Sequence, residues 1–280
     1  AAASRPQSIS LVGNRRIGKS SLLYYLYHPA TRKKFLADPE MYMFAFIDFQ
    51  QEQLSSVQAF FEVIYDALYQ EYLEKFSIPV SPDYSGFKDL VRALDAQGRR
   101  LIILVDEFDM VTTNPVFDVD FFAFLRSMAN KYNLAYVVTT AEDLQSLCHS
   151  QQIAASPFFN IFSNFNLGPF KHEEAQELIA QPSEAAGHSL EPFAEEIFAF
   201  AGYLPFFLQI ACSVFFELLK NGRSKSRETI QEAKTLFLEE AEVHFKHLWE
   251  KLSPNEVALV RKIISGKKPK ESEQYLANKL

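Results

Sequence analysis

The sequence predicts an α/β fold in which a parallel sheet carries helices on both faces and is followed by an all-helical region. Strand patterns alternate with helix patterns over residues 8–170, which is typical of parallel sheets joined by crossover helices. The central strand candidates are almost continuously apolar, as expected where both faces of a strand are covered. After Pro169 only helical patterns follow.

Five short segments are predicted to form the strands. The second reads MYMFAFIDF and the third reads LIILV, and neither shows the alternation of a half-exposed strand. The first ends in a glycine-containing loop, and the fourth ends in two threonines. The strands are predicted at 8–12, 41–49, 101–105, 134–138 and 162–167.

Helical periodicity fills the intervals between these strands. In the segment 54–76, apolar residues such as Phe60, Phe61, Ile64 and Leu68 recur at steps of three and four, which places them on one helix face. Beyond the sheet, glycines and prolines separate the helical segments. The helices are predicted at 20–27, 54–76, 87–94, 117–132, 173–180, 192–201, 205–221, 228–252 and 255–265.

Length and composition predict a globular chain with more than one domain. The chain has 280 residues, of which 48% are hydrophobic and 22% are charged. A single hydrophobic core stops growing at roughly 250–300 residues. We therefore expect an α/β domain over residues 1–170, a helical lid domain over 171–252, and a third segment over 253–280.

The charge balance and the cysteine content restrict the classes of function. The formal net charge is -7, whereas phosphate-backbone binding relies on surplus Lys and Arg, so the composition carries no strong nucleic-acid signal. Two cysteines, Cys148 and Cys212, are too few for a disulfide framework or a zinc cage. This pattern is typical of a reducing compartment, so we expect a cytoplasmic protein.

One segment has the composition of a membrane span. Residues 197–216 carry no charged side chain, and about 20 apolar residues are enough to cross a bilayer. Gly202, Pro205 and Gln209 interrupt the segment, however. Two buried helices joined by a turn explain it better, and we expect no membrane span.

The loop after the first strand carries the strongest motif. Residues 13–20 match G-x-x-x-x-G-K-[ST] and lie between a predicted strand and a predicted helix, as a phosphate-binding P-loop must. Glycines let the backbone approach phosphates, Lys19 provides a charge for the β- and γ-phosphates, and the Ser20 hydroxyl is a ligand for Mg²⁺. The predicted nucleotide-binding residues here are Gly13, Asn14, Arg15, Arg16, Ile17, Gly18, Lys19, Ser20 and Ser21.

Acidic residues follow the third strand. Ligands of open α/β sheets bind at the carboxyl ends of the strands, where Asp106 and Glu107 lie. We predict that Asp106 holds the Mg²⁺ through water and that Glu107, with Lys19, is catalytic, acting as the general base for a water that attacks the γ-phosphate. Asp109 is expected to be an ordinary solvated loop residue.

Two further positions have alternative interpretations. Thr139 and Thr140 end the fourth strand, where a hydroxyl can contact the γ-phosphate, and we predict Thr140 as the nucleotide contact; Thr is also a common strand residue. Arg126, on the preceding helix, is either an arginine finger for a neighbouring subunit or a surface arginine in a salt bridge.

Several segments together resemble a STAND-class P-loop NTPase of the AAA+-related branch. They are GNRRIGKSS, ILVDEFD, VVTTA, NLGPFKHEEAQELI and AGYLPFFLQ, in this order. The resemblance implies that a glycine-x-proline motif of the lid contacts the nucleotide, and Gly202-Tyr203-Leu204-Pro205 is similar to it. Pro205 is therefore predicted to sense the nucleotide; a simple turn between two core helices is the alternative.

The resemblance also implies neighbouring modules. A winged-helix domain follows the lid in this class, and residues 252–264 look like its beginning. Members carry an adenine-contacting segment before the first strand, whereas seven residues precede Ser8 here, so we expect this chain to lack part of a longer protein. Members also join an effector to a sensor module, which implies an effector or sensor fused to this chain or acting in trans.

The expected function is a slow, Mg²⁺-dependent ATPase that works as a molecular switch, binds ATP and ADP and self-associates on activation. The alternatives are a motor or loader that acts on nucleic acid, and a nucleotide-binding scaffold without hydrolysis. A GTPase is disfavoured because its guanine-reading Asn-Lys-x-Asp motif should follow a strand. The nearest match, residues 130–133, precedes one and ends in Asn133.

Overall fold

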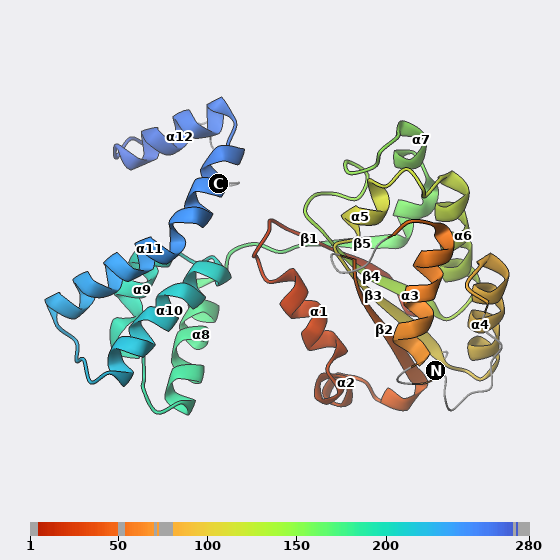
Figure 1. Cartoon of the computed structure of the whole chain (residues 1–280), viewed down its shortest axis with the longest axis horizontal. Helices are drawn as coiled ribbons and strands as arrows, with labels where there is room; N and C mark the ends of the chain where they lie inside the picture. Colours follow the sequence, from red (N-terminus) through yellow and green to blue (C-terminus); the bar gives the residue numbers. More distant parts are fainter. Residues whose placement is uncertain (1–4, 50–53, 70–71, 73–80, 271–272, 274–280) are drawn as a thin grey trace. The chain divides into compact units, whose positions relative to one another are not determined.

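The computed structural model describes residues 5–49, 54–69, 72, 81–270 and 273 (Figure 1). The chain divides into two compact units, residues 1–169 and residues 170–280. The first unit contains the sheet, and the described part of the second unit contains helices and no strand.

The first unit is built on a five-stranded parallel sheet with the strand order β2-β3-β4-β1-β5. The predicted parallel α/β class is therefore confirmed. The strand that ends in Asp106 and the strand that ends in two threonines are neighbours. The strands are β1 (Ser8–Val12), β2 (Tyr42–Asp48), β3 (Arg100–Asp106), β4 (Leu134–Thr140) and β5 (Phe162–Asn166).

Helices cover both faces of the sheet, as Figure 1 shows. Helix α1 (Lys19–Tyr27) lies on one face and is followed by α2 (Pro29–Phe35). The other face is covered by α3 (Val57–Tyr69), α4 (Tyr84–Ala96) and α6 (Val119–Lys131). Alternate residues of each strand point to opposite faces, so each central strand contributes to two hydrophobic clusters.

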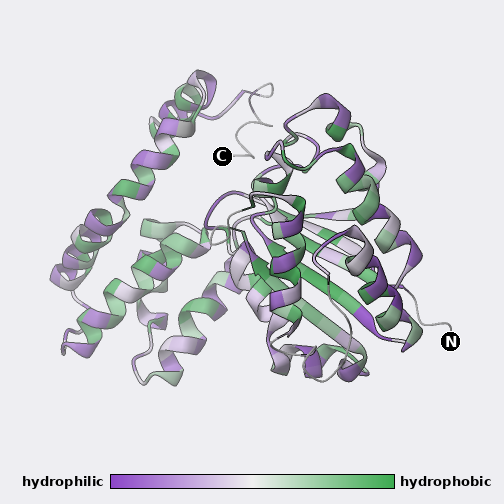
Figure 2. Ribbon diagram, turned by 45° about the vertical axis from the view of Figure 1, so that its right-hand side comes forward, coloured by the Kyte–Doolittle hydropathy of each residue, from purple (hydrophilic) through white to green (hydrophobic). Residues whose placement is uncertain are grey.

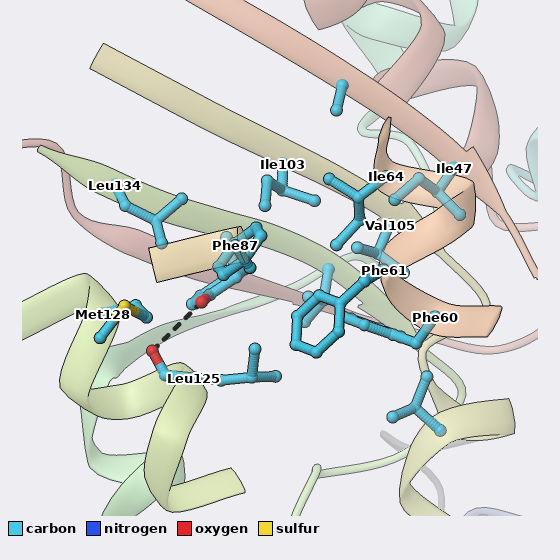
Figure 3. Packing of buried hydrophobic residues seen from close by; sticks show 14 of the residues in the cluster. Ile47, Phe60, Phe61, Ile64, Phe87, Ile103, Val105, Leu125, Met128 and Leu134 are labelled. Atoms are coloured by element: carbon cyan, nitrogen blue, oxygen red, sulfur yellow. Dashed lines mark hydrogen bonds between the residues drawn. The ribbon is translucent and has the colours of Figure 1, made fainter. Parts of the chain in front are cut away.

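The larger cluster lies between the sheet and α3, α4 and α6, and its packing is drawn in Figure 3. Phe60, Phe61 and Phe87 are almost completely buried there. The hydroxyl of Tyr136 donates a hydrogen bond of 3.1 Å to the carbonyl of Leu125. The central strands are mostly hydrophobic along their length, as burial on both faces requires (Figure 2).

The second unit is a set of packed helices around one hydrophobic cluster. Helix α10 supplies the largest share of this core and packs against α8, α9 and α11. Among the described helices of the whole chain, none has both the length and the hydropathy to cross a bilayer. The long helices are α8 (His172–Ala185), α9 (Ala194–Ala201), α10 (Pro205–Lys220), α11 (Arg227–Lys251) and α12 (Pro254–Ile264).

The structure differs from the sequence prediction in a few elements. The predicted helix 54–76 corresponds to α3, which is described as far as Tyr69, and most of 70–76 lies outside the described residues. Helix α8 continues through Pro182, although we predicted that it ends at residue 180. Short elements were not predicted. They are η1 (Pro39–Met41), α2 (Pro29–Phe35), α5 (Asp109–Thr112), α7 (Gln151–Ala154) and η3 (Pro157–Ile161). A separate turn, η4 (Glu191–Phe193), takes the place of the start of the predicted helix 192–201.

Candidate functional site

The loop between β1 and α1 is shaped by its two glycines. A Cβ atom on Gly13 would lie 2.9 Å from Cγ2 of Ile17 and 2.9 Å from the carbonyl oxygen of Leu167, so no larger residue fits without movement. Gly18 precedes α1 with a φ of 97°, a left-handed conformation that glycine adopts without steric cost. The side chain of Ile17 is buried and so anchors the loop to the interior of the first unit.

Both neighbouring strands fix the start of this loop. The backbone N–H of Gly13 donates to the carbonyl of Thr140 over 3.2 Å, and the N–H of Leu167 donates to the carbonyl of Val12 over 2.7 Å. The loop therefore stands at the carboxyl ends of β1, β4 and β5, which is the edge where ligands bind in open α/β sheets.

Lys19, the first residue of α1, points back into the loop. It is 6% exposed, and its Nζ donates hydrogen bonds to the carbonyls of Gly13 (2.7 Å) and Asn14 (3.1 Å). Burial lowers the pKa of Lys19, and the negative charges of the nearby acids oppose this shift. These acids are Glu107, Asp109 and Asp106, in order of their effect. The structure thus brings the lysine together with the acids that follow β3.

Asp106 ends β3 and lies on the same face of the sheet as α1, because the residues of β3 alternate between the faces. It is 5% exposed. The Thr139 hydroxyl donates to Oδ1 of Asp106 over 2.5 Å and accepts the backbone N–H of Glu107 over 2.9 Å. One hydroxyl group therefore ties the two acids of the predicted site to the end of β4.

Glu107 has an unusual backbone conformation, with a φ of 55°. Such a left-handed conformation is uncommon for a residue with a side chain and is held here by the neighbouring hydrogen bonds. Burial raises the pKa of Glu107, the charge of Asp109 adds to this, and Lys19 acts in the opposite direction. The carboxyl group is thus partly buried and lies within the field of the P-loop lysine.

The two threonines at the end of β4 face opposite sides of the sheet. Thr139 shares the face of Asp106, whereas Thr140 falls on the face of Tyr136 and Val138. Thr140 is fully buried, and its hydroxyl has no hydrogen-bond partner among the described residues. The predicted site therefore contained Thr140 and not Thr139. Because alternate residues of a strand share a face, counting positions along β4 identifies Thr139 as the residue on the face of Asp106.

Asp109 is not the solvated loop residue that we expected. It begins α5, and its Oδ2 accepts the backbone N–H of Ala141 over 3.0 Å. Its Oδ1 is buried and has no partner within the described chain. Burial raises the pKa of Asp109. A helix of one turn has no hydrophobic periodicity that could predict it, and this helix brings the carboxyl group beside the site.

The remaining predicted residues lie at the rim of the loop or elsewhere. Asn14, Arg15 and Arg16 are exposed in the loop, and Ser20 and Ser21 are exposed in the first turn of α1. The charge of Arg15 contributes to lowering the pKa of Lys19.

Pro205 lies in the second unit, where it is the first residue of α10. A proline is favourable at this position because the first N–H of a helix has no intrahelical partner. Gly202, just before it, has a φ of 61°, so the Gly-x-x-Pro segment also makes the turn between α9 and α10.

The donor atoms at the carboxyl edge of the sheet suit Mg²⁺. Magnesium prefers oxygen ligands and is held by one or two carboxylates or hydroxyls when phosphates complete its coordination. Asp106 offers a buried carboxylate of which one oxygen is already oriented by Thr139, and Ser20 offers an exposed hydroxyl. These two residues would hold the ion.

Comparisons with known proteins agree with this geometry. The model of the family described as Novel STAND NTPase 2 matches residues 3–268 of this chain. The fold is similar to that of the ORC2 protein of Aeropyrum pernix (TM-score 0.68, 15% identity, covering 93% of this chain and 69% of that chain). It is also similar to that of a Walker-type ATPase of Pyrococcus abyssi (TM-score 0.64, 19% identity, covering 96% and 82%).

A third structure of similar fold is domain III of the Thermotoga maritima replication initiation protein DnaA (TM-score 0.51, 14% identity, covering 82% of each chain). At these identities the solved structures show a shared fold. Among curated proteins, none matches this chain.

Proposed function

Because the chain belongs to the Novel STAND NTPase 2 family, it is a P-loop NTPase, and we propose that it is an ATP-binding, magnesium-dependent switch that hydrolyses ATP slowly. The observation that carries this proposal is the cluster at the carboxyl edge of the sheet. There, the buried Lys19 lies within the electrostatic influence of Asp106 and Glu107. A structural P-loop without function would not need two acids beside its lysine.

Each residue of the cluster has a distinct task in the proposed reaction. Lys19 exchanges its hydrogen bonds with the loop carbonyls for the β- and γ-phosphate oxygens. Magnesium, when bound, would neutralise phosphate charge, and Asp106 and Ser20 are the residues that would hold it.

The attacking water needs a base and a fixed orientation. Glu107 accepts its proton as the bond to the γ-phosphorus forms, and the leaving ADP takes the charge of the broken bond. The Thr139 hydroxyl positions both acids, since it hydrogen-bonds to the side chain of Asp106 and to the main chain of Glu107. Thr139 is therefore a positioning residue.

The switch function requires a part of the chain that responds to the nucleotide. We assign this role to the helical lid and to Pro205 at the start of α10. Since a ligand shifts an equilibrium only by its different affinities for the two states, ATP must bind one arrangement of the lid more tightly than the other. The output would be self-association, or the control of an effector fused to the chain or acting in trans, in the cytoplasm.

Titration calorimetry with ATP and Mg²⁺ tests this proposal on the full chain. Lys19→Ala should abolish or sharply weaken the binding of ATP, because the γ-phosphate loses its cationic partner. Lys88→Ala, which removes an exposed lysine of α4, is the matched control and should bind as the parent does. Absence of binding by the parent chain, or tight binding by Lys19→Ala, would refute the assignment of the site.

A motor or loader acting on nucleic acid is the second candidate, since DnaA is named as a replication initiation protein and its domain III has a similar fold. The net charge of -7 supports the switch instead. The rate of ATP hydrolysis with and without duplex DNA separates the two. Strong stimulation that disappears with added salt would favour the motor, whereas unstimulated, slow turnover would favour the switch.

A further inference from the structure

A cavity lies at the opposite end of the sheet from the P-loop. It has a volume of about 460 Å³ and is bordered by the start of β1, the start of β4, the last two turns of α6 and the end of η3. Its polar lining residues are Arg5, Gln7, Ser8, Arg126, Asn130 and Asn160. All of them belong to the first unit.

The lining contains two guanidinium groups and no carboxylate. Cavities with this composition favour anions because Arg donates hydrogen bonds in a fork that matches the oxygens of carboxylates and phosphates. Arg5 already donates from Nη1 to the backbone carbonyl of Asn130 over 2.6 Å. This bond covers a carbonyl at the end of α6, the part of a helix that would otherwise repel an anion.

Arg126 is the distinctive residue of this cavity. Its Nε is buried, yet it has no hydrogen-bond partner among the described residues. The surface salt bridge that the sequence suggested for Arg126 is not formed within the described part of the chain. An unpaired, buried N–H group is costly. Arg126 itself lines the cavity and so brings a positive charge to it that no carboxylate of the lining neutralises.

We propose that this cavity binds a small organic dianion, either a phosphate monoester or a dicarboxylate, through Arg126 and Arg5. The volume is in the range of known small-molecule pockets. The asparagine and glutamine amides supply further hydrogen bonds, and Leu134 and Ile161 supply apolar contact for the carbon skeleton. β1 separates this cavity from the P-loop, so the ligand does not occupy the nucleotide site.

Inorganic phosphate and succinate are the probes for this site, titrated by calorimetry into the full chain that carries Lys19→Ala. This background removes the main cation of the P-loop, so the heat of phosphate binding reports on the cavity at the opposite end of the sheet. We expect saturable binding of at least one probe. Tighter binding of phosphate identifies a phosphate ester as the ligand class, and tighter binding of succinate identifies a dicarboxylate.

Substitution of the arginines completes the test. Arg126→Gln should raise the Kd of the bound probe about tenfold or more, which is the usual effect of losing a charged hydrogen bond. Arg5→Gln should raise the Kd of the probe as well. Because Arg5 is exposed, this variant tests the proposal even if Arg126→Gln does not fold. Arg92→Gln, at an exposed arginine of α4, is the matched control.

Two results would overturn the proposal. One is the absence of saturable binding for both probes in the folded Lys19→Ala chain. The other is binding that neither arginine substitution weakens. Both results leave the assignment of the nucleotide site intact, because ATP binding by the parent chain is measured separately.

Discussion

Adjacent threonines at the end of β4 have opposite surroundings, and this makes them a sensitive test of the site. Thr139→Val removes a hydroxyl that accepts from the N–H of Glu107 and donates to Asp106. Both groups would lose a partner, so we expect ATP turnover to fall about ten- to hundredfold while ATP still binds. Turnover and calorimetric Kd, measured together, check this expectation.

Thr140→Val is the matched control, since it makes the same exchange one residue away. Its buried hydroxyl has no partner in the described chain, so an isosteric methyl group should leave turnover unchanged and raise the melting temperature. A loss of ATP affinity in Thr140→Val would instead support the role that the sequence suggested for Thr140.

Glu107→Gln keeps the shape of the side chain but removes the proposed base. We expect ATP binding to persist and hydrolysis to slow by a factor of about 10²–10⁴, the usual contribution of general base catalysis. Glu62→Gln, at an exposed residue of α3, should have no effect. Single-turnover release of phosphate is the measurement, and an undiminished rate would remove Glu107 from the mechanism.

Sequence patterns predicted the residue types of the candidate site better than their surroundings. Lys19, Asp106 and Glu107 come from a motif and from their place after apolar runs, and these signals are local in the chain. The surroundings depend on which strands are neighbours and which face each residue occupies. Thr139 and Asp109 were missed for this reason, because their partners lie more than thirty positions away in the sequence.

At the scale of elements, the space around Gly13 and Gly168 predicts that substitution by Ala affects the protein much more at Gly13 than at Gly168. Gly13→Ala would bring a Cβ atom to 2.9 Å from Ile17 and from the Leu167 backbone. We expect the loop to be displaced, with a loss of about 1–3 kcal/mol in stability and weaker ATP binding.

Gly168→Ala is the control, because its Cβ meets nothing within 4 Å. Its effect on stability should stay within about 0.5 kcal/mol. Thermal melting and ATP titration of both variants provide the comparison. Equal behaviour of the two variants would show that the close approach at Gly13 does not matter.

The strands and long helices were predictable because their hydrophobic periodicity extends over several turns or pairs of residues. One-turn elements such as α5 and α7 have no such periodicity. The continuation of α8 through Pro182 could not be predicted because a proline usually ends a helix. The buried Ser183 hydroxyl donates to the carbonyl of Ile179 over 2.6 Å and so stabilises the turn that a proline usually breaks.

For the whole molecule, the switch proposal predicts that scattering differs between the ATP-bound and ADP-bound chain. Pro205→Ala should reduce this difference if the lid senses the nucleotide through α10. Pro254→Ala is a matched control, because Pro254 is also the first residue of a helix, α12. Small-angle X-ray scattering provides the measurement. A difference that Pro205→Ala leaves untouched would support a simple turn at this position.

The organisation of the second unit was predicted only in part. Its helices follow from the sequence, but the division into a lid and the beginning of a winged helix stays a prediction. Helix α12 starts with a Ser253 capping box, which explains why a helix begins there and does not identify the domain to which it belongs.

The alternation of β4 between two hydrophobic clusters has a consequence for insertions and deletions. Removing one residue from this strand would turn every following side chain over, so that Thr140 would take the place of Thr139 beside the acids and the apolar residues would exchange clusters. Removing two residues would shorten the strand yet return each side chain to its own side. This strand should therefore tolerate the deletion of two residues better than the deletion of one.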